Sequence, residues 1–233
     1  KDFDGNWGIW DEPYLQYVAK HLTAQKSPFV AGIFTLSSHH PYNLPPEYQG
    51  KIAEGSLPVH KTIRYTDASL RKFFQTASQQ PWYNNTLFIF TADHSHPDSD
   101  DARYRDEPIG RYRVPILLFH PKEELVFIDS SKVVQQVDIL PTILDYIGKK
   151  DPNLYSIGES MFKKGEGKAI FYRNERFFYA KKTGYLELLQ DIAPFPFQNQ
   201  ALSPDSLAAY GKQIRAWRQY MNQKMETDSW MKK

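Results

Sequence analysis

The sequence predicts an α/β fold: a mainly parallel sheet with helices on both faces, extended by antiparallel strands and closed by a terminal helix. Two observations support this prediction. Between residues 11 and 147, helical periodicity alternates with short, nearly continuous apolar runs, which are typical of strands covered on both faces. Beyond residue 158 apolar residues alternate with polar ones, as in antiparallel strands with one wet face.

The first half of the chain contains two predicted helices, each followed by an apolar run of strand length. Acidic residues and a proline open the stretch 11–25, where apolar residues recur at helical spacing. The run 29–36 (FVAGIFTL) is typical of a buried strand, and the proline-rich stretch 37–50 behind it must be a loop. A second helix is expected over 59–78 and a second strand over 86–91.

A third strand and a third helix follow. The run 114–119 (VPILLF) predicts the strand, and the apolar spacing in 133–147 predicts the helix. Pro141 should start a new helical segment or a kink, because proline lacks the N–H that a helix interior needs. Gly148 is placed to cap the end of this helix.

The last third of the chain has a different pattern. Strands that run antiparallel and join near Thr183 and Gly184 are expected within 169–189, and an amphipathic helix is expected over 202–225. At 233 residues, the chain has the length of one large α/β domain. We therefore predict a single domain over 1–233, with the core pattern in 1–162 and the antiparallel strands and terminal helix in 163–233.

Composition excludes several classes of function. The absence of cysteine excludes thiol nucleophiles, cysteine-based zinc sites and iron–sulfur clusters. A net charge of +2 on 29 basic and 27 acidic residues argues against an extended nucleic-acid surface. The first residues do not have the pattern expected of a signal peptide, and no apolar run approaches the roughly 18 residues expected of a membrane span. The chain begins without Met and in mid-pattern (KDFDGNWGIWDEPY), so we expect it to be a piece of a longer protein.

Two histidine-rich loops directly follow predicted strands, at 37–42 and 93–98. In open α/β sheets ligands bind beyond the carboxyl ends of the strands, so both loops are candidates for one site. The pair Asp93 and His94 supplies a carboxylate oxygen and an imidazole nitrogen, which suit a divalent ion such as Zn²⁺ or Mn²⁺. The competing interpretation is that Asp93 caps a turn and His94 is an ordinary hydrogen-bonded loop residue.

The remaining polar candidates have less specific signals. His96 is either a further ligand, a substrate contact or a residue without a direct role. His40 and His120 are expected to be packing or loop residues, and His21 and His60 to be solvated on helices. One of four arginines before the third strand could bind an anionic headgroup: Arg103, Arg105, Arg111 and Arg113.

Several stretches together resemble the sulfatase and alkaline-phosphatase superfamily, and within it the lipoteichoic acid synthase and phosphoglycerol transferase group. They are TLFIFTADHSH, TLSSHHPYNLP, IRYTDASLRKFF, RYRVPILLFHP with QQVDILPTILDYIG, and IGESMF. In the second stretch, His39 stands two residues before Pro41 and is followed by the aromatic Tyr42, as in that group's substrate-contacting loop. The resemblance runs from about Trp7 to Phe162 and implies an alkaline-phosphatase-like fold.

The resemblance also implies a metal-dependent reaction on phosphate or sulfate esters. Asp93 and His94 match a pair that holds one divalent ion, with Mn²⁺ favoured and Zn²⁺, Mg²⁺ or Ca²⁺ as alternatives. His39 matches a residue that contacts substrate or acts as an acid. The group's nucleophilic Thr and first metal-binding acid have no match here. We therefore expect about half of a metal site, weak metal binding and no turnover by this chain alone.

The function implied is transfer of phosphoglycerol, or a similar phospho-headgroup, from a phospholipid donor to an envelope glycan or lipid acceptor. Such domains lie on the extracytoplasmic face of the bacterial inner membrane, in the periplasm or cell envelope, behind N-terminal membrane helices. The alternatives are a sulfatase or phosphoester hydrolase, which usually has Gly where this chain has Ser95, and a non-catalytic envelope-binding module. Without further strands the sheet would expose an apolar edge, so self-association is expected.

Overall fold

The computed structural model describes residues 2–96, 98–107, 109–125, 129–149, 156–189 and 203–229. They form two compact units, residues 1–124 and residues 125–233, and each is described by itself. The single domain expected over 1–233 stays a prediction. None of the helices in the described part of the chain has the length and apolar character that crossing a bilayer requires.

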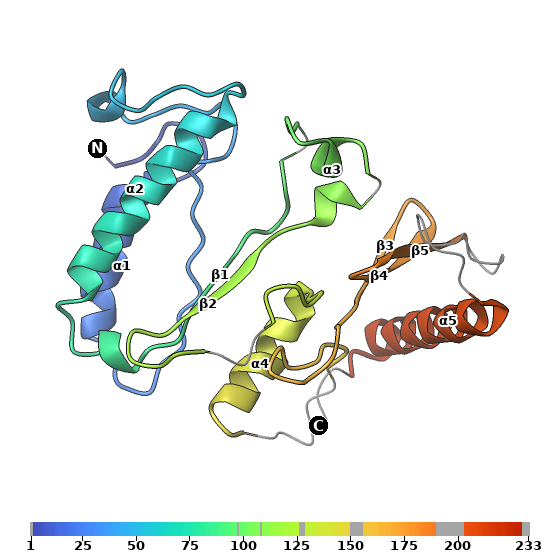
Figure 1. Cartoon of the computed structure of the whole chain (residues 1–233). Coiled ribbons are helices and arrows are strands. Elements are labelled where there is room, and N and C mark those ends of the chain that lie inside the picture. The colour runs from blue at the N-terminus through green and yellow to red at the C-terminus, as the bar shows by residue number, and fades with distance from the viewer. Residues whose placement is uncertain are drawn as a thin grey trace. The chain divides into compact units, whose positions relative to one another are not determined.

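Two packed helices form the centre of the first unit. Helices α1 (Asp11–Thr23) and α2 (Val59–Ala77) lie side by side (Figure 1), and both confirm predicted helices. The apolar face of α1 packs against that of α2 and against the turn that follows it. The buried residues of this core are Leu15, Val18, Ala19, Phe73, Ala77 and Trp82.

The sheet of the first unit corrects one prediction. Strands β1 (Phe88–Thr91) and β2 (Ile116–Phe119) occur where strands were expected, but they pair antiparallel, with Phe88 opposite Phe119. In the described residues, both sheets contain antiparallel pairs only. The apolar runs predicted these two strands correctly but not their direction or their burial: both strands are half-buried to exposed. The direction of a strand depends on how the connection to it returns. Among its described residues, the connection between β1 and β2 contains the short helix α3 (Ala102–Arg105) and a 3-10 turn η3 (Gly110–Tyr112), and it leads back along β1.

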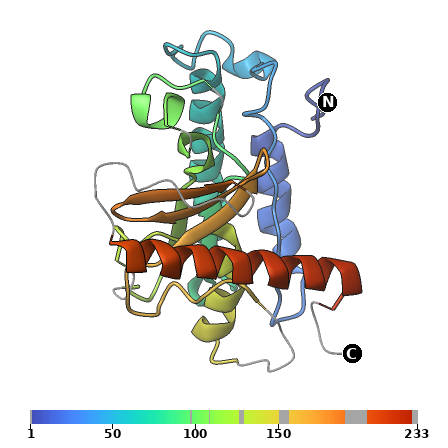
Figure 2. The same cartoon turned by 90° about the vertical axis from the view of Figure 1, so that its right-hand side faces the viewer.

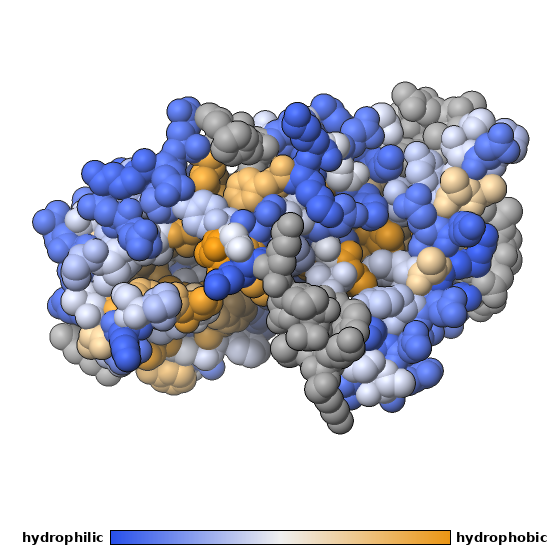
Figure 3. Space-filling model, turned by 90° about the horizontal axis from the view of Figure 1, so that it is seen from below, coloured by the Kyte–Doolittle hydropathy of each residue, from blue (hydrophilic) through white to orange (hydrophobic). Residues whose placement is uncertain are grey.

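The run 29–36 is the second correction, because it forms no strand with the described residues. Its side chains are largely exposed, with Val30 89% and Phe34 60% accessible, and Leu117 of β2 is 60% accessible. Hydrophobic side chains reach the surface in several places on the face seen in Figure 3. Exposed apolar residues in an unpaired extended segment support the expected self-association, which itself stays a prediction.

In the second unit the predicted helix 133–147 begins later than its apolar pattern. A 3-10 turn η4 (Gln136–Asp138) precedes helix α4 (Ile139–Tyr146), because the side chains of Gln135 and Asp138 form a capping box there. Pro141 lies in the first turn of α4, where its missing N–H costs nothing. Gly148 ends the helix as predicted, with φ +66° and hydrogen bonds from Gly148 N to Asp145 O (3.1 Å) and from Lys149 N to Leu144 O (2.8 Å).

The antiparallel prediction for the last third is confirmed. Strands β3 (Ala169–Arg173), β4 (Arg176–Lys181) and β5 (Gly184–Leu189) pair in chain order. Asn174 and Glu175 form the first hairpin turn with φ 48° and 64°, the backbone that a two-residue type I′ turn requires. The second turn lies at Lys182 and Thr183, as expected.

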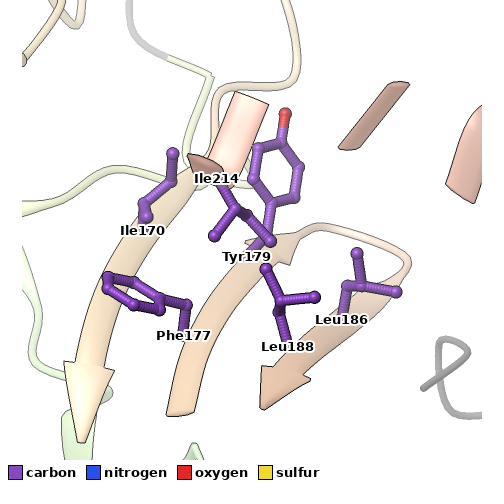
Figure 4. Packing of buried hydrophobic residues seen from close by; sticks show 6 residues of the cluster. All are labelled: Ile170, Phe177, Tyr179, Leu186, Leu188 and Ile214. Atoms are coloured by element: carbon purple, nitrogen blue, oxygen red, sulfur yellow. The ribbon is translucent and has the colours of Figure 1, made fainter. Parts of the chain in front are cut away.

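Helix α5 (Pro204–Thr227) lies across this sheet (Figure 2). The side chain of Ser203 caps its N-terminus, and Pro204 occupies its first turn. Ile214 of α5 points toward apolar side chains of all three strands, and together they form the core of this unit (Figure 4). The strand residues of this core are Ile170, Phe177, Tyr179, Leu186 and Leu188.

Candidate metal and substrate site

Asp93 and His94 lie where the backbone bends away from the end of β1. The backbone N–H of His94 donates to Asp93 Oδ1 at 2.9 Å, and His94 Nε2 lies 3.4 Å from Asp93 Oδ2. Both side chains are more than half exposed. The bend therefore turns two adjacent residues to one side, as a shared cation would require.

The hydrogen bonds of His94 determine which nitrogen is available. Nδ1 lies 2.9 Å from the carbonyl oxygen of Ser95, and because a carbonyl only accepts, Nδ1 carries the proton. In the neutral ring, Nε2 then has the free lone pair, and it lies beside the Asp93 carboxylate. In metal-bound histidines one ring nitrogen commonly binds the ion while the other donates its N–H to a carbonyl or a carboxylate. The donor chemistry fits a divalent ion, but within the described residues no group of three metal-ligating side chains comes together. This pair thus offers two donor groups, and their role as metal ligands stays a prediction.

His39 lies in a second loop, residues 37–48, called here the His39 loop. Its ring packs against Trp7, with ring centroids 4.2 Å apart, and its Nδ1 donates to the carbonyl of His40 at 3.0 Å. The indole N–H of Trp7 donates to the same carbonyl at 2.7 Å. Trp7 was not singled out in the sequence. Its only signal there is a large aromatic residue at the point where the family resemblance begins.

The His39 loop contacts the loop that carries Asp93, residues 92–107, called here the Asp93 loop. The hydroxyl of Tyr42 lies 2.7 Å from Nε2 of His96, across 54 positions of sequence. Tyr42 adopts a left-handed φ of 61°, directly after a cis His40–Pro41 bond. His96 Nδ1 also lies 2.8 Å from the carbonyl of Asp98. Both ring nitrogens of His96 are therefore engaged by protein groups.

A cavity of about 150 Å³ adjoins His96 and includes the His60 ring in its lining. His60 was expected to be solvated on a helix, but it lines this cavity from the first turn of α2. Ser56, close by, donates a hydrogen bond to Asp100 of the Asp93 loop. Nothing in the local sequence around His60 indicates this position, because the other wall comes from residues about 40 positions away. The full lining is Leu57, Val59, His60, Ile63, Ser95, His96, Asp98, Ser99, Asp100 and Tyr104.

Three of the four candidate arginines pair with carboxylates. These pairs are Arg103 with Asp101, Arg105 with Asp106 and Arg113 with Glu107. The hydrogen bonds from Arg103 lower the pKa of Asp101 to about 2.

Arg111 differs from these three arginines. Its carbonyl accepts a hydrogen bond from the Ser95 hydroxyl at 2.5 Å, which places its backbone beside the residue that follows the Asp93–His94 pair. Its guanidinium has no acidic partner among the described residues. Arg111 is thus the one of the four best placed to meet an anion.

The other histidines are packing or surface residues, as expected. His40 lies against Trp7, with ring centroids 5.5 Å apart, and His21 stacks on Tyr17 at the surface. His120 is buried and accepts a hydrogen bond from the backbone N–H of Lys122 at 3.2 Å.

Asp11 holds the start of the His39 loop and was missed by the sequence analysis. Its carboxylate is fully buried and accepts hydrogen bonds from Leu36 N (3.1 Å), Ser37 N (3.0 Å) and the Thr66 hydroxyl (2.7 Å). In the sequence it appeared only as one of two acids opening a helix. Only the folded chain brings the amides of residues 36 and 37 to that carboxylate.

Glu12 holds the other end of the same loop. Tyr48 donates a hydrogen bond to its carboxylate, and Lys72 Nζ donates another at 2.6 Å. Burial acts to raise the pKa of Glu12, but these two hydrogen bonds outweigh it and leave the pKa below its ordinary value. The hydrogen bonds to Glu12 and Tyr48 raise the pKa of Lys72. Two neighbouring acids of α1 thus fix both ends of the loop that carries His39.

Comparisons with known proteins identify the family of this chain. The family model for sulfatases matches residues 1–149. Lipoteichoic acid synthase 1 of Bacillus subtilis (strain 168) is 25% identical in an alignment of 201 residues that covers 80% of this chain and 31% of that protein. Lipoteichoic acid synthase of Staphylococcus aureus (strain NCTC 8325 / PS 47) is 24% identical in an alignment of 186 residues that covers 74% of this chain and 29% of that protein. The chain spans about a third of the length of these relatives.

Two solved structures establish the fold. A protein of the alkaline phosphatase superfamily from Vibrio parahaemolyticus superposes with a TM-score of 0.77 at 23% identity, covering 99% of this chain and 58% of that one. A lipoteichoic acid synthase from Listeria monocytogenes superposes with a TM-score of 0.65 at 19% identity, covering 93% of this chain and 60% of that one. The architecture is therefore alkaline-phosphatase-like. Since the sulfatase family model covers well over half of its residues, the chain belongs to the sulfatase family, within the sulfatase and alkaline-phosphatase superfamily.

Proposed function

We propose that this chain contributes the Asp-His half of a cation site to a transferase of phosphoglycerol or a similar phospho-headgroup. The donor is a phospholipid, the acceptor is an envelope glycan or lipid, and the site of action is the extracytoplasmic face of the bacterial inner membrane. The observation that carries the proposal is the Tyr42–His96 hydrogen bond. It joins the loop of the substrate-contacting candidate His39 to the loop of the Asp93–His94 pair.

In the proposed reaction each residue has a distinct task. Asp93 and the Nε2 of His94 would hold a divalent ion, with Mn²⁺ favoured over Zn²⁺, Mg²⁺ and Ca²⁺. Such an ion polarises the phosphoester and lowers the pKa of an attacking hydroxyl. His39, oriented by Trp7 and the His40 carbonyl, would contact a phosphate oxygen or donate a proton to the leaving alkoxide. A positioned acid of this kind contributes about 10²–10⁴-fold in rate.

Two alternatives use the same residues. A sulfatase or phosphoester hydrolase would transfer the group to water, but Ser95 stands where those enzymes usually have Gly. A non-catalytic envelope-binding module would use Arg111 and the His39 loop without turnover. Release of diacylglycerol from phosphatidylglycerol by the full-length protein, with phosphoglycerol attached to an added glycan or lipid acceptor and both products absent from Asp93→Ala, supports the transferase. Release of diacylglycerol together with free glycerol phosphate supports the phosphoester hydrolase. Hydrolysis of an aryl sulfate without diacylglycerol release supports the sulfatase.

The cation site is tested first, by calorimetry with Mn²⁺ and with Zn²⁺ on this chain. We compare it with Asp93→Ala/His94→Ala and with the control His21→Ala, which removes an exposed imidazole on α1. Weak binding that is lost in the double variant and retained in the control supports the site. Equal binding by all three proteins would contradict it. Since only two ligands come from this chain, we expect affinity well below that of a complete site.

A further inference from the structure

The second unit contains a cavity of about 250 Å³ that the proposed function does not use. Its lining is dominated by basic side chains: five lysines face two carboxylates, and one of the lysines, Lys181, also lies 3.8 Å from the Glu166 carboxylate, which leaves an excess of two positive charges. Most of this lining lies beyond residue 149, where the match to the family model ends. The charged residues are Lys132, Lys163, Lys164, Lys168, Lys181, Asp138 and Glu159.

Hydrogen bonds connect the segments that line this cavity, called here the lysine cavity, at both of its ends. At one end Val133 N donates to Glu166 O at 2.9 Å, and a Cβ at Gly167 (φ +68°) would lie 1.9 Å from Val133 O. Only glycine permits that approach. At the other end, Asp138 Oδ1 accepts the backbone N–H of Glu159 at 2.8 Å. The segments 132–138 and 157–168 therefore form a fixed frame around the cavity.

Lys132 and Lys164 bring positive charge to the cavity in different ways. Lys132 Nζ donates to the carbonyls of Met161 (3.0 Å) and Lys163 (2.6 Å), which fixes its position and leaves one N–H for another acceptor. Lys164 is exposed, and its ammonium has no acidic partner within the described residues. The cavity thus has one anchored ammonium group and one free one.

Glu159 acts as an internal counter-ion. Its carboxylate lies 3.1 Å from Lys168 Nζ and 3.6 Å from Lys163 Nζ. The hydrogen bond from Lys168 and the charges of both lysines hold the pKa of Glu159 below its ordinary value. An incoming anion would meet two lysines already paired with this carboxylate, so removal of its charge should strengthen anion binding.

We propose that this cavity binds an oxyanion of the phosphate class, either inorganic phosphate or a phosphate ester, and that Glu159 competes with it. Lysine ammonium groups bind phosphate as compact point charges and need no planar partner. The excess of two positive charges favours a multiply charged anion over chloride. Lys132 and Lys164 are the principal donors. This inference stands independently of the proposed transferase activity.

In the first experiment, the whole chain is titrated with inorganic phosphate at low ionic strength, and calorimetry measures the dissociation constant. Lys164→Gln should weaken binding about fivefold, the effect of one ammonium about 4 Å away near water. Glu159→Gln should strengthen binding by a similar factor, and its backbone contact to Asp138 is preserved. The control Lys212→Gln, an exposed lysine on α5, should stay within about twofold.

A second arm distinguishes free phosphate from lipid phosphate. Vesicles of phosphatidylcholine with phosphatidylglycerol are sedimented with each protein, and bound protein is measured. The proposal is supported if either probe binds and its binding weakens in Lys164→Gln and strengthens in Glu159→Gln. The probe that binds shows whether the ligand is free phosphate or lipid phosphate. The proposal is overturned if neither probe binds, or if Glu159→Gln leaves binding unchanged or weaker while circular dichroism shows an intact fold.

Discussion

The two loops that carry the candidate residues are held in opposite ways. The His39 loop is fixed at one end by the fully buried Asp11 and at the other by Glu12. The Asp93 loop is held by surface ion pairs and by the Tyr42–His96 contact, and Asp93 itself is 57% exposed. Surface ion pairs contribute little to stability. The His39 loop is therefore preorganised, whereas the Asp93 loop would gain more order if it bound the proposed cation.

The largest expected effect is that of Asp11→Ala. Loss of this carboxylate leaves two buried amides and the Thr66 hydroxyl without their acceptor, which should lower the free energy of unfolding by about 3 kcal/mol. Urea denaturation followed by tryptophan fluorescence measures this change. The matched control Asp93→Ala removes an exposed carboxylate and should change stability by less than about 0.5 kcal/mol. Equal losses in the two variants would remove the contrast between the loops.

A smaller effect is expected from Tyr42→Phe, which deletes one hydrogen bond between the loops. The loss should be about 1 kcal/mol, and it should fall mainly on the Asp93 loop, which has few other anchors. Hydrogen exchange of the amides in 92–96 should accelerate, while those at 36 and 37 should not. Tyr17→Phe, on the exposed side of α1, serves as the control. Equal acceleration of hydrogen exchange in both loops would show that they open as one cooperative unit.

The smallest effect concerns pH and the Glu12–Lys72 pair. The folded pKa of Glu12 lies below its ordinary 4.5, so its contribution to stability is present above that pH and is lost as pH falls through the folded value. The folded pKa of Lys72 lies above its ordinary 10.5, so its contribution is present below that pH and is lost at more alkaline pH. With Lys72 47% exposed, the pair should contribute less than about 1 kcal/mol.

Denaturation of the wild type and of Lys72→Met at pH 7 and at pH 4 measures this contribution. The wild type should lose more stability on acidification than the variant, because the variant lacks the partner that lowers the Glu12 pKa. An identical loss in both proteins would mean that Tyr48 alone sets the pKa of Glu12.

The candidate residues were accessible to sequence reasoning only where a motif carries them. Asp93, His94 and His39 lie in short stretches with a family pattern, and their local bends and loops follow from neighbouring residues. Asp11, Trp7 and the lysine cavity carry no such pattern. Their roles arise from contacts between residues far apart in sequence, such as Asp11 with Ser37.

The sequence by itself determined the helices α1, α2 and α5, the positions of strands β1 and β2, the end of α4 at Gly148, and the hairpins of β3 to β5. These features depend on periodicity, caps and turn residues within a few positions of one another. Only the tertiary structure decided that β1 and β2 run antiparallel, that residues 29–36 form no strand with the described residues, and that two acids hold the His39 loop. The physical reason is that strand pairing and buried hydrogen bonds depend on which distant segments of the chain lie next to one another. An apolar run indicates that a packing partner is needed, but it does not indicate which segment that partner is.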